Sequence, residues 1–567
     1  MTLSCLFLTS QIFAQSSQTD TTETTSVRGT VVNSVTREGI GRALVSSPDN
    51  RFATLTDSEG HFEFMMPASS EARGGSQPGR DGVVVHHPTV NRLDSLVARK
   101  PGFLEDHVRP TDVSAAGKDF TVTLVPEALV VGRVVLPSSD PSDKIRVELY
   151  RRQVQDGRAH WARVGSIASK SNGEFRFADL SAGSYKLLTD ELLDRDPLTF
   201  DPRGQVYGYP PVYSPAAKEF ASGETFQLSP GKTFQTSISL VRQPYYQVKI
   251  PVLNAPAGGL RVTVSAQGRG PGYALGYNDQ EQTIEGMLPN GSYTLEASSF
   301  GVNSVSGVVH ISVRGTAVEG PRMILTPNGS IPVNVEEEFT SSQNPGATTW
   351  SSGGHTFSVK GPRLYLNVHL EPADDFGSEQ AATLRGPTGP EDESLILDNV
   401  HPGRYWVRIN SSVGFTSSVT YGGKDLQREP IVVGAGGSNA SLEIVMSDNG
   451  AEVEGFVEGV AKPPSDAGTF GQVSRAISYE SAAHVYLVPQ PDSGGEFREA
   501  WVSPDGTFNL QQVPPGTYRV LAFDHTQPEL EYRDAEAMRA YEAKGQVLRF
   551  VAGKKEQLRL QVIATGE

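Results

Sequence analysis

The chain has 567 residues, and at roughly 100 to 150 residues per domain this length predicts about four to six domains rather than one core. The 58 glycines and 38 prolines exceed ordinary usage and favour many turns and few long helices. The net charge of −16 opposes binding along a phosphate backbone, so nucleic acid is not expected as a partner. The single cysteine, Cys5, excludes a disulfide framework or a cysteine-rich metal site within one chain.

Residues 1–14 carry no charge and contain two short apolar runs, which predicts the rear part of a secretory signal cleaved after Ala14. The charged start of such a signal is missing, so the signal would be truncated. Residues 15–25 are then expected to form a polar linker. We therefore expect an exported protein, extracellular, periplasmic or associated with the cell envelope. No apolar run approaches the roughly 18 residues that a membrane helix needs, so no transmembrane segment is expected.

A small turn followed by an aromatic residue recurs four times along the chain, at intervals of roughly 110 residues. Such a period marks tandem domains, and its length suits β-sandwiches of roughly 100 residues. Recurrence at one structural position predicts packing rather than a site, with each tyrosine ring in a core and its hydroxyl paired to nearby backbone. The four pairs are Gly183 with Tyr185, Gly291 with Tyr293, Gly403 with Tyr405, and Gly516 with Tyr518.

Two further signals keep step with this period. Opening strands with alternating apolar residues and an internal glycine are predicted at 27–31, 130–134 and 453–457, where the glycine marks a bulge or a close backbone approach. Hairpin turns are predicted at 57–62, 172–175 and 505–508, since Asn-Gly and Asp-Gly supply the positive φ that tight turns demand. The aromatic residues after two of these turns, Phe175 and Phe508, each precede the glycine of the small turn at the same spacing, which indicates one hairpin geometry used repeatedly.

These signals predict an all-β chain: a tandem array of about five Ig-like or transthyretin-like β-sandwiches with a short helix in the last. The helix is expected at 534–543, where Met538 and Tyr541 share a face and Gly545 can act as a cap. The first sandwich is degenerate, with a polar insert at 68–82. The predicted sandwiches are 26–126, 127–243, 244–327, 328–448 and 449–567.

The combination of a V-x-G-x-V strand, a D-G-x-F hairpin and a P-G-x-Y turn resembles the carboxypeptidase regulatory-like domain. That domain is a transthyretin-like, seven-stranded sandwich grouped with the carbohydrate-binding-like folds and close to Cna protein B-type domains. The resemblance is strongest at 127–243 and 449–567 and weakest at 244–327. The run 419–426 and the insert 528–541 resemble the C-terminal part of large secreted multidomain proteins typical of acidobacteria. The resemblance implies a non-catalytic protein, because the family's domain accompanies a metallocarboxypeptidase without itself being catalytic.

Searches for catalytic or metal-binding sets lead to the same expectation. A zinc carboxypeptidase needs His and Glu three residues apart, and none of the 11 histidines has this spacing. The pairs His61 with Glu63 and His369 with Glu371 would share a strand face, but chance alone makes such pairs common. Asp194 and Asp196 lack the continuation of a calcium loop and favour a turn before proline. Isopeptide chemistry is disfavoured because arginine cannot supply the amine at Arg28 or Arg133. No catalytic residue, metal or cofactor is expected.

One segment could bind a ligand. Tyr207, Tyr209 and Tyr213 fall within seven residues, with Trp161 upstream, and flat rings on a rigid turn can stack on sugars or on a proline-rich peptide. The alternative, which we favour, is that these rings close the sandwich. For Tyr532, Met538 and Tyr541 near the predicted helix, packing is likewise favoured over partner binding.

Repetition without a catalytic set predicts a secreted, non-enzymatic array that serves as a spacer, scaffold or adhesive surface protein. Two alternatives remain open at this point. One is a carbohydrate-binding protein that uses the tyrosine-rich segment, and the other is an accessory region of an exported enzyme. The expected partners are a glycan or another exported or cell-surface protein. Fold alone does not choose among these functions.

Overall fold

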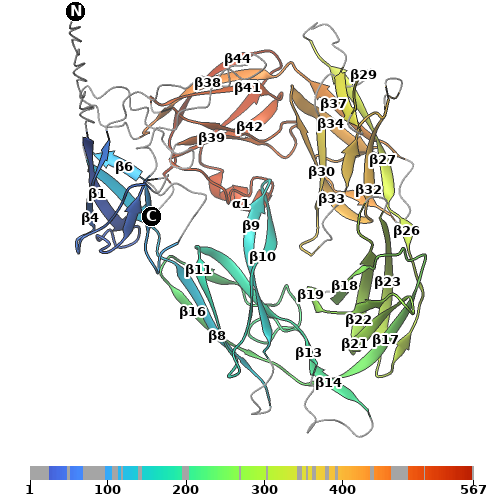
Figure 1. Ribbon diagram of the computed structural model, residues 1–567. Coiled ribbons are helices and arrows are strands. Elements are labelled where there is room, and N and C mark those ends of the chain that lie inside the picture. The colour runs from blue at the N-terminus through green and yellow to red at the C-terminus, as the bar shows by residue number, and fades with distance from the viewer. Residues whose placement is uncertain are drawn as a thin grey trace, which may run out of the picture. The chain divides into compact units, whose positions relative to one another are not determined.

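The computed structural model describes residues 24–47, 51–67, 96–104, 113–116, 119–137, 144–193, 204–266, 270–301, 304–340, 348–352, 355–359, 366–376, 382–389, 392, 394–434, 440–460, 483–503 and 505–564. The predicted signal at 1–14, the insert at 68–82 and the pair Asp194 and Asp196 lie outside these residues. The described chain is almost entirely β-structure, arranged as two-layer sandwiches (Figure 1). The described residues form two compact units, one that ends at Pro126 and one that begins at Glu127.

The first unit is one sandwich. Its strands form a four-stranded sheet in the order β4-β1-β7-β6 and a three-stranded sheet in the order β3-β2-β5. The strands are β1 (Thr24–Asn33), β2 (Leu44–Ser46), β3 (Ala53–Leu55), β4 (His61–Pro67), β5 (Val97–Arg99), β6 (Val113–Ala116) and β7 (Asp119–Leu124).

The second unit begins with a sandwich built from sheets β10-β9-β12-β15 and β11-β8-β16. Its strands are β8 (Ala128–Val135), β9 (Arg146–Gln155), β10 (Arg158–Ala168), β11 (Glu174–Leu180), β12 (Gly183–Thr189), β15 (Phe226–Leu228) and β16 (Thr233–Ser239). Strands β9 and β10 are the longest pair here and form a hairpin.

The third sandwich combines the sheet β13-β14-β17-β21-β20, which also includes β24 and β25, with the sheet β19-β18-β22-β23-β26. Strands β13 and β14 come from the predicted range of the second sandwich, yet β14 pairs with β17 and so extends the sheet of the third. The strands are β13 (Leu192–Leu193), β14 (Val206–Tyr209), β17 (Gln243–Leu253), β18 (Arg261–Ala266), β19 (Gly270–Tyr273), β20 (Gly276–Asn278), β21 (Thr283–Pro289), β22 (Gly291–Ser298), β23 (Val305–Val313), β24 (Val318–Glu319), β25 (Met323–Ile324) and β26 (Thr326–Pro327).

The fourth sandwich has sheets β31-β32-β27-β37-β34-β35 and β30-β33-β36, with β28 and β29 as a separate hairpin. Its strands are β27 (Gly329–Glu338), β28 (Thr348–Ser352), β29 (His355–Val359), β30 (Leu366–Pro372), β31 (Thr383–Arg385), β32 (Leu395–Val400), β33 (Gly403–Ser411), β34 (Phe415–Tyr421), β35 (Lys424–Asp425), β36 (Ile431–Val433) and β37 (Leu442–Ser447).

The last sandwich has sheets β41-β38-β44 and β40-β39-β42-β43. Its predicted helix forms as a short α-helix, α1 (Ala535–Met538), that runs into a 3₁₀ turn, η1 (Arg539–Tyr541). Asp534 caps α1 by accepting hydrogen bonds from the Glu536 and Ala537 amides. The strands are β38 (Ala451–Glu458), β39 (His484–Pro489), β40 (Arg498–Trp501), β41 (Thr507–Val513), β42 (Gly516–Phe523), β43 (Gln546–Phe550) and β44 (Lys555–Gln561).

One topology recurs in all five sandwiches. An opening strand pairs antiparallel with a hairpin strand on one side and parallel with a late strand on the other. The opening strands are β1, β8, β17, β27 and β38. A separate cluster of buried apolar side chains fills each sandwich. Since alternate residues of every opening strand face this core, period-two alternation in the sequence has a direct structural counterpart.

Two of the three glycines predicted in opening strands, Gly132 and Gly455, lie beneath aromatic rings, whereas Gly29 is approached closely by the Phe120 backbone. Gly132 pairs with Phe175 on β11, and a methyl group on Gly132 would come within 2.3 Å of that ring. Gly455 pairs with Phe508 on β41, and a methyl group there would come within 2.5 Å of the ring. Each phenylalanine thus covers a strand position that has no side chain, which accounts for the joint recurrence of Gly and Phe in the sequence.

No helix among the described residues is long and apolar enough to cross a membrane.

Candidate functional site

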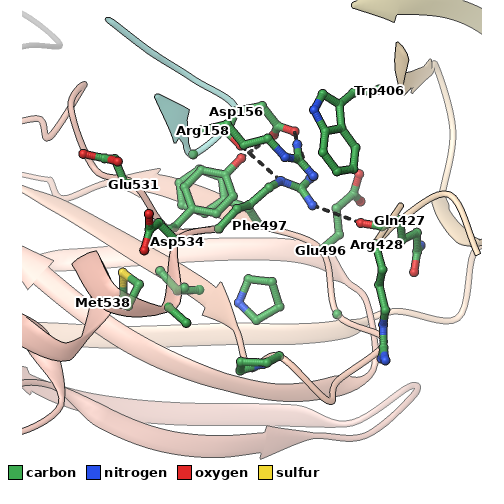
Figure 2. A pocket seen from close by; sticks show the side chains of 18 of the residues that line it. Asp156, Arg158, Trp406, Gln427, Arg428, Glu496, Phe497, Glu531, Asp534 and Met538 are labelled. Carbon is green, nitrogen blue, oxygen red and sulfur yellow. Dashed lines mark hydrogen bonds and ion pairs between the residues drawn. The ribbon is translucent and has the colours of Figure 1, made fainter. Parts of the chain in front are cut away.

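The β9–β10 hairpin carries charged residues from the second sandwich to the fourth and fifth. Its two-residue turn, Asp156 and Gly157, has φ values of 48° and 68°. Positive φ at both central residues is what a type I′ hairpin turn requires, and Asp-Gly is among the pairs that adopt it best. Residues 155–158, here called the tip, lie between sandwiches four and five (Figure 2).

The Asp156 carboxylate lies at the centre of four donors. Its Oδ2 lies 3.2 Å from Arg158 Nη1 and 2.9 Å from Arg533 Nη2. Its Oδ1 lies 2.8 Å from Arg408 Nη1 and accepts a hydrogen bond from the Tyr532 hydroxyl. A carboxylate has about four acceptor positions, so this one has none left for a substrate or a metal. The side chain is only 12% exposed, and its partners come from sandwiches two, four and five.

The tip packs against Tyr532 and neighbouring residues of the last sandwich. A methyl group on Gly157 would come within 2.6 Å of the Tyr532 ring, so the turn lies directly on the ring face. On its other side the ring stacks on Phe497, with centroids 3.9 Å apart and planes 5° apart. Arg533 adds backbone contacts, since its amide donates to Gly157 O at 3.1 Å and its Nε donates to Asp156 O at 3.1 Å. Burial, reinforced by the Asp156 charge, raises the pKa of Tyr532 and keeps its hydroxyl a donor.

The fourth sandwich forms the other side of the contact. The Arg158 guanidinium lies 3.5 Å from the centre of the Trp406 ring, a cation–π contact. Arg408, which contacts Asp156 through Nη1, also places Nε 2.8 Å from Glu371 Oε2. Burial, followed by the charge of Arg533, lowers the pKa of Arg158 to about 10, so this arginine still carries its charge at neutral pH.

Further ion pairs line β9 below the tip. Arg152 makes two hydrogen bonds to the Glu531 carboxylate, at 2.5 and 2.6 Å, in the fork geometry that gives arginine–carboxylate pairs their specificity. Arg151 Nη2 lies 3.2 Å from Glu529 Oε1. The hydrogen bond to Glu531 raises the pKa of Arg152. These pairs orient the body of the β9–β10 hairpin, in addition to the contacts that hold its tip.

An aromatic cluster provides a second contact between sandwiches two and four. Phe376 of the fourth sandwich meets Phe220 with ring centroids 4.8 Å apart and planes 86° apart, and meets Tyr150 at 5.8 Å and 82°. Such edge-to-face pairs contribute beyond their buried area, by about 0.5–1.5 kcal/mol each. Trp161 joins the same cluster, packing on Phe220 at 5.5 Å and donating its amide to Asp375 Oδ1 at 3.2 Å.

Lys186 lies beneath this cluster and is 5% exposed. Its ammonium donates to Phe220 O at 2.6 Å and to Gly223 O at 3.0 Å, and it lies 4.5 Å from the Phe220 ring centre. Burial lowers its pKa. The buried charge is used to fix the loop around residues 220–223, on which the aromatic contact is built.

A cavity of about 1180 Å³ lies beside the tip, walled by three sandwiches. Two contacts lie at its wall: Arg533 Nη1 donates to Gln427 O at 3.3 Å, and Arg498 Nη2 lies 2.9 Å from Glu496 Oε2. Within the described ranges, no three His, Cys, Asp or Glu side chains come close enough to hold a metal ion. Residues lining the cavity that Figure 2 labels include Arg428, Glu496, Phe497, Asp534 and Met538.

The tyrosines of the predicted binding segment do not share a solvent-facing surface. Tyr209 is 5% exposed and Tyr213 is 1% exposed, each packed in an apolar cluster. Tyr207 is half-buried beneath Arg242, whose guanidinium lies 4.3 Å from the ring centre. Trp161 is half-buried in the aromatic cluster. Packing accounts for the described contacts of all four residues, and ligand binding by this segment stays a prediction.

The four repeated tyrosines are each at most 2% exposed. In every case the hydroxyl donates to a backbone carbonyl just upstream, on Ser181, Pro289, Pro402 and Pro514, at 2.8, 2.9, 3.1 and 2.7 Å for Tyr185, Tyr293, Tyr405 and Tyr518. At two of the repeats the ring lies over the glycine two residues earlier: a methyl group on Gly291 or Gly403 would meet the hydroxyl at 2.9 or 2.4 Å. Each tyrosine belongs to a different sandwich, and they form no common cleft.

Sequence reasoning did not single out the tip. The available signal was the Asp156-Gly157 pair between two alternating runs, which predicts a hairpin turn and nothing more. Its partners Tyr532 and Arg533 lie 376 and 377 residues further along the chain, so no local pattern connects them.

Searches of protein-family models and of curated proteins found no match to this sequence. Among solved structures, the Bacillus anthracis TIE protein aligns over 77% of this chain and 74% of its own length, at 10% identity and a TM-score of 0.13. The pilus adhesin SpaC from Lactobacillus rhamnosus GG aligns over 54% of this chain and 43% of its own length, at 12% identity and 0.16. Two B repeat units of the collagen-binding protein Cna of Staphylococcus aureus align over 75% of this chain and all of their own, at 13% identity and 0.12. TM-scores this low carry no argument about this chain, so its function has to be inferred from its own contacts.

Proposed function

We propose that this chain is a non-catalytic array of β-sandwiches with a structural role, a scaffold or adhesive protein of the cell surface or extracellular space. The observation that carries the proposal is the Asp156 contact, in which one carboxylate binds side chains from sandwiches two, four and five. Domains that are joined only by flexible linkers need no such contact. A scaffold that must hold its modules in fixed positions does.

The energetics favour a fixed arrangement. Removing one member of a buried ion pair leaves the other charge without compensation and costs about 3–5 kcal/mol. Asp156 faces three arginines, and Arg152 and Glu531 form a second, fork-shaped pair nearby. The charged groups at this junction are therefore engaged with one another rather than aimed at a reacting atom, which supports a mechanical role over catalysis.

The finer assignment, to carboxypeptidase regulatory-like domains, rests on the sequence motifs and is supported by the pairing of Gly132 with Phe175 and of Gly455 with Phe508. Export rests on residues 1–14 of the sequence alone. Secretion of the full chain with cleavage after Ala14, detected by N-terminal sequencing, would test it.

The structural role can be tested by measuring distances between spin labels placed on sandwiches two and five of the full chain. We expect one narrow distribution for the wild type and a broad one for Asp156→Ala. The matched control is Asn172→Ala, at an exposed turn of the same sandwich whose side chain accepts only a local hydrogen bond, from the Glu174 amide. A wild-type distribution as broad as that of Asp156→Ala would contradict the proposal, as would a hydrolase activity abolished by a point substitution.

A further inference from the structure

Strands β13 and β14, together called the arm, follow β12 of the second sandwich but pack on the third. They pair with each other, and three residue pairs join β14 to β17, among them Val206 with Tyr245. The Tyr245 ring lies against the arm, because a methyl group on Gly208 would come within 2.9 Å of it. Segments that are held by few contacts are the ones that open locally, so the contacts at the base of the arm matter for its position.

Glu191 lies at this base, directly before β13. Its amide donates to Gly272 O at 3.1 Å, and its Oε1 accepts a hydrogen bond from the Ala274 amide at 2.8 Å. Both partners belong to the third sandwich. Glu191 therefore joins the arm to that sandwich through its backbone and its side chain, in addition to the pairing of β14 with β17.

The second carboxyl oxygen of Glu191, Oε2, lies beside the Tyr245 hydroxyl. Both atoms are buried, and neither makes a well-aligned hydrogen bond to a residue that the structure describes. An ionised carboxylate has about four acceptor positions, but here it would have the Ala274 amide and at most the Tyr245 hydroxyl as donors. Burying a charge with so few donors is costly, so the site favours the neutral acid.

The neighbouring groups act on Glu191 in both directions. Burial raises the pKa of Glu191 to about 7; the hydrogen bond from Ala274 lowers this pKa, the Asp190 carboxyl raises it, and Tyr245 lowers it. On the far side of the hydroxyl, Tyr273 and Tyr293 also act on Tyr245, whose pKa is raised chiefly by burial, so that this hydroxyl keeps its proton. The surroundings of Glu191 thus oppose its ionisation.

Asp190 connects this carboxyl to the second sandwich. Burial, followed by the charge of Glu148, raises the pKa of Asp190 to about 6, whereas Arg146 and Arg163 lower it. The Arg146 Nε lies 3.7 Å from Asp190 Oδ2. Glu148 and Arg163 are paired with each other at 2.7 Å. Two adjacent carboxyls at one contact between sandwiches therefore gain charge over the same range of pH.

We infer that Glu191 is a proton-controlled switch for the arm: the neutral acid holds the arm on the third sandwich, and loss of its proton to solvent releases it. An open arm lets the carboxylate be hydrated, which the closed arm does not allow. Release uncovers the edge of β17 and the Tyr245 ring. The inference goes beyond the proposed function, because it concerns sandwiches two and three and does not involve the Asp156 contact.

The direction of the pH dependence follows from the raised pKa. The closed arm holds the Glu191 proton more tightly than an open arm, in which the carboxyl has its ordinary pKa of 4.5. The closed arm is therefore most stable at acidic pH, and its stability falls as the pH rises to about 7.

The test is amide hydrogen exchange of the full chain, followed by mass spectrometry at pH 5 and pH 8 and corrected for the pH dependence of intrinsic exchange. In the wild type, protection of the β14 amides should be at least about tenfold lower at pH 8 than at pH 5. Glu191→Gln keeps an acceptor for the Ala274 amide and cannot ionise, so its β14 amides should be equally protected at both pH values. Peptides from β22 and β23 should remain protected at pH 8, which would show that the arm opens while its sandwich stays folded.

Glu281→Gln is the matched control, because it removes an exposed carboxylate of the same sandwich beside Lys249, and it should keep the wild-type difference. Equal protection of β14 at both pH values in the wild type would show that the inference is wrong. So would a loss of protection in Glu191→Gln as large as in the wild type, or exchange of β14 only together with β22 and β23.

Melting curves establish that the variants are folded. If Glu191→Gln does not fold, Asp190→Asn takes its place: it removes the neighbouring charge and should reduce the difference between pH 5 and pH 8, and an unchanged difference would contradict the inference. None of these measurements uses the labels on sandwiches two and five, so the proposed function is tested separately.

Discussion

Arg533 contacts Asp156 twice across 377 residues of sequence: its Nη2 lies 2.9 Å from the carboxylate, and its Nε donates to the backbone carbonyl at 3.1 Å. The second contact depends on the left-handed conformation of Asp156, because that conformation sets the direction of the carbonyl. The arginine therefore recognises both the charge of the turn and its shape, and each property can be tested separately.

Removing the charge of Asp156 should lower the free energy of unfolding. Asp156→Ala leaves Arg158, Arg408 and Arg533 close together without their shared anion, and we expect a loss of about 3–5 kcal/mol, measured by urea unfolding. The control is Asp119→Ala, which breaks an ion pair with Arg28 in which both side chains are more than half exposed and which should cost less than about 1 kcal/mol. Equal losses for the two variants would show that the Asp156 carboxylate is no more than a surface charge.

Changing the shape of the Asp156-Gly157 turn should destabilise the protein through a clash with the Tyr532 ring. Gly157→Ala adds a methyl group at a φ of 68° and forces it against the ring, so we expect a drop in melting temperature. Gly204→Ala, at a φ of 78° with nothing near the added methyl, measures the conformational strain alone. In a double-mutant cycle, Tyr532→Ala should relieve part of the Gly157→Ala penalty. Strict additivity would mean that ring and glycine do not interact.

The repeated tyrosines can be tested at Tyr518, which is fully buried and donates to Pro514 O at 2.7 Å. Tyr518→Ala should destabilise the last sandwich by about 3–5 kcal/mol, the usual cost of removing a large core aromatic. Tyr518→Phe keeps the ring but loses two hydrogen bonds, the one donated to Pro514 O and the one accepted from the Glu496 amide, so about 0.5–1.5 kcal/mol is expected for each. Denaturant unfolding with a probe in the last sandwich measures both, and an unchanged midpoint for Tyr518→Ala would contradict the packing role.

The stability of the contact between sandwiches two and three should depend on pH because of Glu191. This carboxyl accepts a hydrogen bond from the Ala274 amide at 2.8 Å, and burial raises its pKa from 4.5 to about 7. The adjacent Asp190 has its pKa raised to about 6, also chiefly by burial. Because the folded state holds these protons more tightly than the unfolded state does, the stabilisation is complete below about pH 4 and is lost as the pH rises to about 7.

Melting curves at pH 5 and pH 8 provide the measurement. The wild type should melt at a lower temperature at pH 8, and Glu191→Gln, which cannot ionise, should show a smaller difference between the two. The matched control is Glu281→Gln, at an exposed carboxylate beside Lys249. A pH dependence identical in wild type and Glu191→Gln would rule out this carboxyl as the cause.

The tyrosine-rich segment shows that composition does not determine which side chains are exposed. Tyr209 and Tyr213 are spaced as if to present rings together, but β14 pairs with β17 of the next sandwich and Tyr213 packs against Phe220. Both contacts depend on where a neighbouring strand or loop lies. Spacing along the chain carries no information about that neighbour, so exposure could not be deduced from the tyrosines themselves.

The sequence by itself determined the β-sandwich class, because alternation, turn chemistry and the Gly-Phe and Gly-Tyr pairings act between residues that are close in the chain or adjacent in one sheet. Only the tertiary structure decided that Asp156 lies against Tyr532, Arg533 and Arg408. Such a contact arises when separately folded sandwiches meet, and its strength comes from removing charges from water together. Each of these residues is an ordinary surface residue until that happens.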